Sequence, residues 1–456
     1  MKKELFGIIA HKIGMDKAIA YSSGSRVVQG LTGVLSVFFI TTFLSGVEQG
    51  FYYTFGSIIA LQVFFELGLT GIMTQYVAHE ASHLSLNAEG RYEGEERYVS
   101  RLASLVHFCV KWYAVLAIVV LFFLLAVGNT FFTHYGEDQT DVSWKLPWAL
   151  ICVATAINIF QSPFVSILMG IGKVKEMSEI GFWRQVILPV TNWIGLALGL
   201  NLYVLGIASL LSVLIWQLYV WNTGLSRIFL NLWHTQIHES VSYIKEIFPF
   251  QWKIALSWVS GYFIFQLFNP VLFATEGAVV AGQMGMTMQA LNAIQAFSMS
   301  WLNTKVPEYS RLIALKEYGT LDKLFDKSLK QMVMVCVILL TVFMLFIWFF
   351  NVTQISVGSH IIANRFLDYG PIILLMIPLY LNLYTGSWAT YLRCHKREPF
   401  LLISIFGAIA DGFSTIFLGR MFGLYGITIG YCVLSILFFP WGFWIYKTNK
   451  QKWHGK

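Results

Sequence analysis

Long apolar segments separated by short polar ones run through most of the chain. Each extends for about 20 residues, the length that an α-helix needs to cross the hydrocarbon core of a bilayer. Twelve of these segments can be distinguished, at 27–45, 53–75, 103–127, 146–169, 180–199, 202–222, 250–273, 279–302, 331–350, 367–391, 399–419 and 423–446. The pattern therefore predicts an all-α integral membrane protein with twelve transmembrane helices.

The charged positions orient these predicted helices. Only 12% of the residues are charged, against roughly a quarter in soluble domains. With a cytoplasmic N-terminus, 28 of the 31 Lys and Arg residues fall on the predicted cytoplasmic side, and only Lys145, Arg365 and Arg420 fall outside. Cytoplasmic loops of membrane proteins carry such an excess of Lys and Arg. Both termini are therefore predicted to be cytoplasmic, and the net charge of +7 reflects topology and anionic lipid rather than nucleic acid.

The twelve segments divide into two groups of six around a polar stretch with regularly spaced isoleucines, which is typical of a helix lying in the membrane interface. We predict a cytoplasmic amphipathic segment at 1–24, an N-lobe at 25–225, an interfacial linker at 226–248, a C-lobe at 249–446 and a basic cytoplasmic tail at 447–456. The five cysteines are scattered in or beside the spans and are interpreted as packing residues. No cofactor fingerprint occurs, so neither an enzyme nor a cofactor is predicted.

Two weak internal matches indicate that the halves repeat each other. At an offset of 228 residues, Glu48 falls on Glu276 and Glu80 falls on Glu308. At an offset of 220 residues, the segment 198–214 matches 418–434. Because each half holds an even number of spans, the repeat would be parallel, about an axis along the membrane normal. Two such lobes can enclose a cleft that opens alternately to either side, which is the architecture of a transporter.

Three cations form the first group of candidate binding residues. Arg26 begins the first predicted span, Lys253 begins the seventh, and Arg184 lies just inside the fifth. A membrane substrate with a phosphate or pyrophosphate would be bound by such charges, Arg in a bidentate contact and Lys as a point charge. The alternative is that these side chains reach anionic lipid headgroups at the membrane surface.

Two carboxylates lie deep inside predicted spans. Glu66 and Asp411 would each cost about 3 kcal/mol at a bilayer centre, so both are expected to face the protein interior or a hydrated cavity. Either residue could bind and release a coupling proton or sodium ion. The alternative is a polar contact between helices, made with neighbouring Ser, Thr or Asn residues.

Uncharged amides inside the spans form a third group, whose chemistry suits sugar hydroxyls. We take Gln283, Asn292 and Gln295 as candidate substrate-binding residues, although contacts between helices explain most single amides in membranes. The other members of the group are Asn158, Gln161, Asn269, Gln289 and Asn382.

One short motif favours a different class of function. His79-Glu80-Ala81-Ser82-His83 is an HExxH pattern, which on a helix places two imidazoles on one face and a general base between them for zinc hydrolysis. The sequence marks no third zinc ligand. Glu276 is predicted on the opposite side of the membrane, and Glu308 repeats Glu80 in a half that has no histidine pair. A membrane zinc protease is therefore a less favoured alternative, and no metal ligand is assigned.

The stretch VEQGFYYTFGSIIALQVFFELGLTGIMTQYVAHEAS at 47–82 resembles the Wzx-type polysaccharide flippases of the multidrug/oligosaccharidyl-lipid/polysaccharide (MOP) exporter superfamily. The match consists of a small acidic turn, a Gly-aromatic-Tyr run and the acidic-Leu-Gly-Leu run that begins at Glu66, ahead of a polar exit. Further support comes from the glycine pairs Gly199/Gly206 and Gly419/Gly426 and from the MGIGKVKE loop at 169–176. Arg26 is also placed as in the related lipid II flippases, but those usually have fourteen spans, so lipid II itself is disfavoured.

The resemblance implies a transporter that flips a lipid-linked oligosaccharide across a bacterial inner membrane by alternating access. The carrier would be a polyprenyl pyrophosphate, and the product would serve O-antigen or other surface polysaccharide biosynthesis. Implied partners are membrane lipids, a coupling ion (H⁺ or Na⁺) and other polysaccharide-assembly proteins. A multidrug antiporter of the same superfamily is the alternative, and it would depend on Glu66 and Asp411 more than on the cations.

Overall fold

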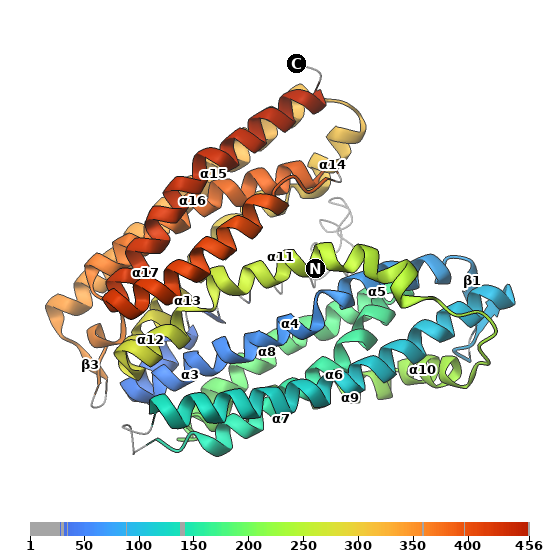
Figure 1. Ribbon diagram of the computed structural model, residues 1–456, viewed down its shortest axis with the longest axis horizontal. Coiled ribbons are helices and arrows are strands. Elements are labelled where there is room, and N and C mark those ends of the chain that lie inside the picture. The colour runs from blue at the N-terminus through green and yellow to red at the C-terminus, as the bar shows by residue number, and fades with distance from the viewer. Residues whose placement is uncertain are drawn as a thin grey trace, which may run out of the picture. The chain divides into compact units, whose positions relative to one another are not determined.

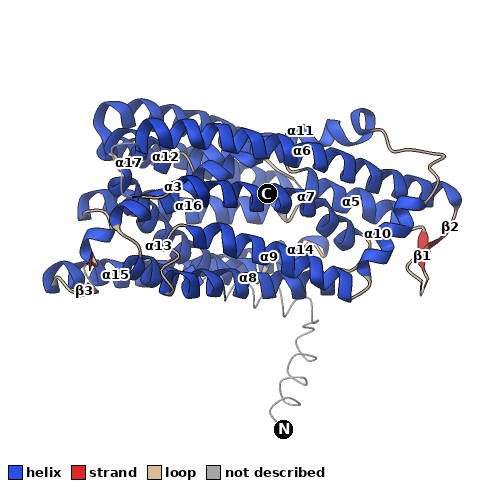
Figure 2. Ribbon diagram, turned by 90° about the horizontal axis from the view of Figure 1, so that it is seen from below, coloured by secondary structure: helices blue, strands red, loops and turns tan. Residues whose placement is uncertain are grey.

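The structure is a computed structural model that describes residues 28, 32–33, 35–87, 89–136, 142–357, 360–395 and 397–454. These residues form long α-helices joined by short loops, in the order shown in Figure 1. Within the described residues, strands occur only as two short hairpins (Figure 2): β1 (Leu84–Leu86) pairs with β2 (Tyr92–Gly94), and β3 (Ser356–Val357) pairs with β4 (His360–Ile361). The predicted all-α architecture is confirmed.

By its contacts the chain divides into two compact units. Unit 1 comprises the described residues up to Thr32 together with Leu61–Phe131 and Ser143–Trp258. Its helices are α4 (Val63–Glu66), α5 (Leu69–Ala81), most of α6 (Glu96–Gly136), α7 (Lys145–Gly170), α8 (Val174–Ala197), α9 (Tyr203–Asn222), α10 (Leu225–His234), the π-helical turn η2 (Tyr243–Ile247) and the first part of α11 (Phe248–Phe265).

Unit 2 comprises the described residues within Gly33–Ala60, Phe132–Val142 and Val259–Lys456. Its helices are α3 (Gly46–Ile59), α12 (Phe268–Glu276), α13 (Ala278–Asn303), α14 (Val306–Ala314), α15 (Tyr318–Thr353), the short turn η3 (Ala363–Arg365), α16 (Tyr369–Arg393) and α17 (Leu401–His454). The short turn η1 (Ala60–Gln62) crosses from unit 2 into unit 1. Because the boundary falls there and inside α6, it differs from the predicted boundary at 226–248, and the division into six plus six spans stays a prediction.

Helices occupy every predicted span from 53 onward. In the described part of the chain, α6, α7, α9, α15, α16 and α17 are each long and apolar enough to cross a membrane. The stretches Gly46–Glu66 and Leu69–Ala81 meet the same criteria as one span with a 43° bend. The helix α17 covers two predicted spans. Gly423 lies between them in a non-helical conformation (φ 56°) and separates the two halves of α17. The chain is therefore a multi-pass membrane protein.

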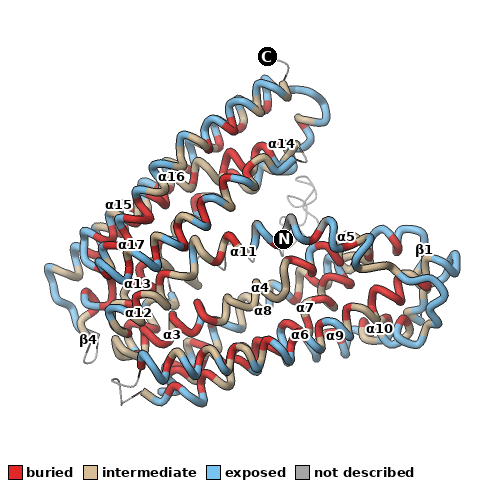
Figure 3. The backbone as a smooth tube through the Cα atoms, viewed as in Figure 1, coloured by how far each residue is buried: buried red, intermediate tan, exposed pale blue. Residues whose placement is uncertain are grey.

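Burial follows the pattern expected of helices that face lipid on one side. Figure 3 shows buried and exposed positions alternating along α15, α16 and α17. Large apolar side chains such as Phe122, Leu218 and Phe413 are at least 60% exposed, whereas the interiors of the units bury aromatic clusters. Phe51, Phe55, Phe132 and Phe273 of unit 2 are fully buried in one such cluster. The exposed apolar faces are those that a bilayer would cover.

The helices α3 and α13 pack so closely that their backbones touch. A Cβ atom on Gly50 would lie 2.0 Å from the carbonyl oxygen of Ala278, and one on Gly282 would lie 2.8 Å from the backbone nitrogen of Gly50. Small residues permit such close approach between membrane helices. The amide of Gln49 reinforces the contact, since its Nε2 atom donates to the carbonyls of Gly282 (2.8 Å) and Arg365 (3.0 Å).

Candidate functional site

The span that carries Glu66 is broken at that residue. The helix α4 ends at Glu66, Leu67 (φ 52°) and Gly68 (φ 67°) both adopt the left-handed conformation, and α5 begins at Leu69. A left-handed conformation is uncommon for leucine and costs about 1 kcal/mol or more. The Glu66 carboxylate is half-buried and accepts a 2.7 Å hydrogen bond from the hydroxyl of Thr70. The acidic-Leu-Gly-Leu run is thus a helix break with a carboxylate beside it, the type of element that transporters use to bind ions and substrates.

Arg184 of α8 is held by neutral partners on two other helices. Its Nε atom donates to the hydroxyl of Ser212 on α9 (2.8 Å), and its Nη2 atom donates to Oδ1 of Asn158 on α7 (3.0 Å). No carboxylate among the described residues forms an ion pair with this guanidinium. The side chain is therefore a cation fixed by neutral groups, in a helix that covers the predicted span 180–199, and these contacts do not balance its positive charge.

A layer of amides adjoins Arg184 in the same three-helix assembly. Gln161, one helical turn from Asn158 on α7, donates from Nε2 to the carbonyl of Val213 (3.2 Å) and to Oε1 of Gln217 (3.0 Å). Gln161 is 3% exposed, and its own Oε1 atom is buried without a hydrogen-bond partner in the described structure. Unit 1 thus contains a polar layer between α7, α8 and α9 that consists of one cation and neutral hydrogen-bonding groups.

Asp411 of α17 is the buried carboxylate of unit 2. Its side chain is 7% exposed, and its Oδ1 atom has no hydrogen-bond partner among the described residues. It interacts electrostatically with Tyr431 of the second half of α17, whose hydroxyl accepts a 3.0 Å hydrogen bond from Asn382 of α16. A carboxylate with an unpartnered oxygen in such a place is costly when charged.

The other predicted binding residues whose side chains the structure describes all belong to one helix of unit 2. Gln283 donates to the carbonyl of Asn364 (3.0 Å), Asn292 is exposed and Gln295 is half-buried, and all three lie on α13 of unit 2, whereas Arg184 lies in unit 1. Arg26 lies outside the described residues, as does the side chain of Lys253. The roles predicted for these five residues stay predictions.

Comparisons with known proteins identify the fold. No protein-family model matches the sequence, and no curated protein sequence matches it. An inward-facing multidrug resistance transporter of the MATE family, in the MOP superfamily, is similar with a TM-score of 0.66 and 15% identity over 93% of this chain and 99% of that chain. An outward-facing member of that family is similar with a TM-score of 0.53 and 15% identity over 95% of each chain. The chain has the fold of a MATE family transporter.

A third structure with this MATE fold is a MOP superfamily transporter from Pyrococcus furiosus (TM-score 0.51, 15% identity, 94% of this chain and 95% of that chain). It is described as having a binding pocket of reverse polarity that suggests a different function. All three similar structures are transporters and none is an enzyme. The predicted superfamily fold is confirmed, whereas the Wzx-type flippase branch stays a proposal.

Within the MATE fold of this chain, the HExxH residues serve another purpose. Glu80 is 2% exposed, and its Oε1 atom accepts hydrogen bonds from Nε (3.1 Å) and Nη2 (3.0 Å) of Arg101 on α6. The imidazole of His83 stacks on Tyr98 at 4.1 Å, and that of His79 is largely exposed. The described residues contain no group of three or more metal-ligating side chains. The glutamate that the motif offers as a base is therefore the buried partner of an arginine.

Arg101 also joins α6 to η2, which lies in the predicted linker and within unit 1. Its Nη2 atom contacts Glu246 of η2 at 2.8 Å, and the hydroxyl of Tyr76 donates to the backbone carbonyl of Glu246 (2.5 Å). The hydrogen bonds from Arg101 hold the pKa of Glu246 below its ordinary value. The stabilisation from this contact is therefore complete above the ordinary pKa and is lost as the pH falls through the lowered pKa. Sequence reasoning missed this cluster, because its three charged residues lie in separate segments.

Proposed function

We propose that this chain flips a polyprenyl-pyrophosphate-linked oligosaccharide from the cytoplasmic to the outer leaflet of a bacterial inner membrane, for surface polysaccharide biosynthesis. The observation that carries the proposal is the unbalanced charge of Arg184. A cation inside a membrane span is costly and marks a functional site by default. Its neutral partners Ser212 and Asn158 fix the guanidinium and leave its charge available to an anionic group. A substrate with a phosphate group attached to a lipid carrier supplies such an anion at that depth.

The amide layer beside Arg184 supports a substrate that carries more than a phosphate. The carboxamide groups of Asn158, Gln161 and Gln217 supply both hydrogen-bond donors and acceptors. Sugar hydroxyls are also both donors and acceptors, so they match this chemistry better than a purely apolar drug does. We include Arg26, Lys253, Gln283, Asn292 and Gln295 as further substrate-binding residues in this proposal.

Reconstituted transport is the direct test of the proposed function. Purified protein in liposomes should move a fluorescent oligosaccharide linked to polyprenyl pyrophosphate between leaflets, measured as the fraction of label that an impermeant quencher reaches with time. We expect the rate to exceed that of empty liposomes by about tenfold or more. A rate equal to that of empty liposomes would reject the flippase assignment.

A multidrug antiporter is the second candidate, because the structure of TM-score 0.66 is a multidrug resistance transporter. The same liposomes separate the two functions. Uptake of cationic dyes driven by an ion gradient, without movement of the lipid-linked sugar, would favour the antiporter.

We propose further that transport is coupled to an ion, H⁺ or Na⁺, through Asp411 and Glu66. The unpaired buried oxygen of Asp411 and the position of Glu66 at a helix break support these roles. Replacing Asp411 by asparagine fixes the neutral form, because the amide cannot release a proton or carry a negative charge.

The variant Asp411→Asn is expected to lose the response of transport to an imposed pH or sodium gradient. We expect a wild-type rate that changes about fivefold or more with the gradient, and a variant rate that changes less than about twofold. Its melting temperature should equal or exceed that of the wild type, since the substitution removes a group that is costly to bury when charged. A variant that is destabilised but still responds to the gradient would assign Asp411 a structural role only. Glu66→Gln, tested in parallel, separates the contributions of the two carboxylates.

A further inference from the structure

Two imidazoles meet at the predicted cytoplasmic end of unit 2, away from the residues discussed above. The Nε2 atom of His395, in the loop between α16 and α17, lies 3.2 Å from the Nε2 atom of His454 at the end of α17. The ring of His454 also stacks on Tyr318 of α15 at 4.0 Å. This contact joins the last turn of α17 to the preceding loop.

The surrounding hydrogen bonds define where the protons lie. The Nδ1 atom of His395 lies 3.2 Å from the backbone carbonyl of Tyr391, and since a carbonyl only accepts, this nitrogen carries the hydrogen. The Nε2 atom of a neutral His395 is then an acceptor, and Nε2 of His454 must donate to it. The hydroxyl of Tyr391 donates to Asp322 at 2.6 Å, and its oxygen lies 3.5 Å from Nε2 of His454, a longer contact than the 3.2 Å to His395.

A first and a second added proton act differently on this pair. His454 can take up a proton without losing the contact, because its Nε2 atom already donates. A proton added to Nε2 of His395 places two N–H groups, and two positive charges, face to face at 3.2 Å. The contact is therefore compatible with the neutral and singly charged pair and incompatible with the doubly charged pair.

The charged neighbours offset that second charge only in part, because Asp322 favours the protonated form of His395 whereas Arg397 opposes it. Asp322 of α15 is already paired with Lys450 of α17 at 3.0 Å, and Asp326 is the other acid of α15 that faces this cluster. Arg397 of the loop lies 5.2 Å from the ring of Trp453, which itself packs against His395. Burial, with a smaller contribution from Arg397, lowers the pKa of His395 below its ordinary value. The contact is thus stable above the ordinary pKa of histidine and weakens as the pH falls below it.

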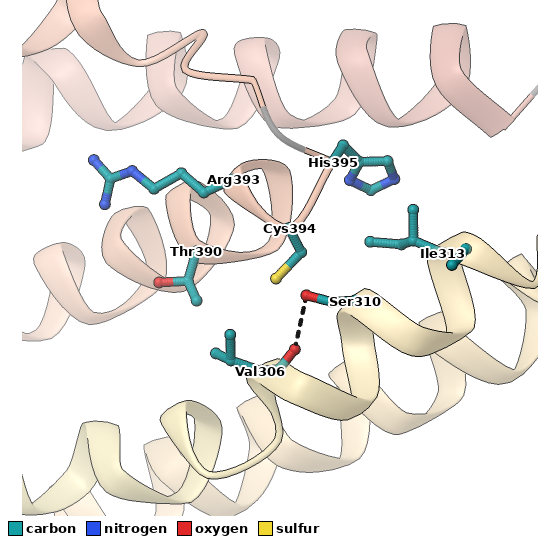
Figure 4. A pocket seen from close by; sticks show the side chains of 8 residues that line it. Val306, Ser310, Ile313, Thr390, Arg393, Cys394 and His395 are labelled. Atoms are coloured by element: carbon teal, nitrogen blue, oxygen red, sulfur yellow. Dashed lines mark hydrogen bonds between the residues drawn. The ribbon is translucent and has the colours of Figure 1, made fainter. Parts of the chain in front are cut away.

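A cavity lies beside this pair. It has a volume of about 550 Å³ and is lined by Ser310 and Ile313 of α14 on one side and by Cys394 and His395 on the other (Figure 4). We propose that the His395–His454 pair is an acid-sensitive latch, which holds the end of α17 over this loop at neutral pH and releases it when both imidazoles are protonated. Release would free the loop, which carries Cys394 and His395 at one wall of the cavity, on the predicted cytoplasmic side of the membrane.

Cys394 provides a reporter within the chain. It is half-buried, whereas Cys109, Cys152, Cys336 and Cys432 are buried, so a maleimide should label Cys394 first. The rate would be measured in detergent between about pH 7.5 and about pH 5.5, for the wild type and for His395→Gln and His454→Gln. Each variant keeps one hydrogen bond across the contact and cannot carry two charges. The loss of thiolate at low pH is common to all three proteins, so it cancels in their ratio.

We expect the labelling rate of the wild type, divided by that of either variant at the same pH, to rise about fivefold as the pH falls. Cys394→Ser gives the background from the other cysteines. Equal pH profiles in all three proteins would overturn the latch. The latch would also be overturned if a chelator changed the labelling rate of the wild type but not that of either variant. The pair would then hold a metal ion instead of a proton. The readout does not involve transport, so the result is independent of the proposed function.

Discussion

Replacing Arg184 by alanine is expected to reduce movement of the lipid-linked oligosaccharide about 30-fold or more, with the protein still folded in the membrane. A charge-assisted hydrogen bond contributes about 1.5–3 kcal/mol, which corresponds to roughly 10-fold to 150-fold in binding or rate. The variant also removes the cation while leaving its partners Ser212 and Asn158 able to bond each other or water. The measurement is the liposome assay with matched amounts of protein and a melting curve for each variant.

Two controls make this result specific. Arg184→Lys keeps the charge but loses the planar fork, so it should retain part of the activity if the guanidinium contacts a phosphate in a bidentate manner. Arg91→Ala removes an exposed arginine of unit 1 and should leave the rate unchanged within about twofold. Full transport by Arg184→Ala would show that the residue only reaches lipid headgroups or joins helices.

Replacing Arg101 by alanine is expected to lower the stability of unit 1 by about 3–5 kcal/mol, the range measured when one partner of a buried ion pair is removed. Glu80 is 2% exposed and depends on Arg101 for the two hydrogen bonds that its carboxylate accepts. Without the guanidinium, Glu80 must be buried as an unpaired anion or bind a proton. The shift in melting temperature of the purified protein measures the effect, and we expect a decrease of about 5 °C or more.

Arg97, one helical turn from Arg101 on α6, offers a matched control variant. Arg97 pairs with Glu239 of the linker at 3.0 Å, but both side chains are more than half exposed. Arg97→Ala removes the same residue type from the same helix and the same linker, and exposed pairs contribute about 1 kcal/mol or less. If Arg97→Ala and Arg101→Ala have the same melting temperature, burial does not distinguish the two ion pairs. Arg101 is then not a central contact of unit 1. Adding Glu80→Gln to Arg101→Ala should recover part of the loss, because it removes the unpaired charge.

The positions of the spans could be predicted from the sequence, but their interruptions could not. An apolar run of about 20 residues indicates a segment that crosses the lipid. The residues on both sides of a helix break within that segment are equally apolar, so the pattern does not mark the break. Leu67 lies in an apolar run and gives no signal of a left-handed conformation, although Gly68 beside it permits one. At Gly423 the prediction agrees with the structure: a new span is predicted to begin there, and this residue separates the two halves of α17.

The candidate site illustrates the same limit for charges. Arg184 and Asp411 could be singled out because charged residues inside spans are expensive, and that argument needs no knowledge of contacts. The partners Ser212 and Asn158 lie 28 and 26 residues from Arg184, and nothing in the sequence pairs them with it. The sequence marks Glu80 as part of a zinc motif and of the internal repeat, but nothing in it pairs Glu80 with Arg101, 21 residues away.

The break between α4 and α5 also has a consequence for the order in which the protein is assembled. At a helix break, backbone N–H and C=O groups lose their partners along the helix, and lipid cannot replace them. The span of α5 packs along α7, which is synthesised later. We infer that α4 and α5 reach their final form only after α7 has entered the membrane, so the second span must wait in a different conformation while the ribosome makes the fourth.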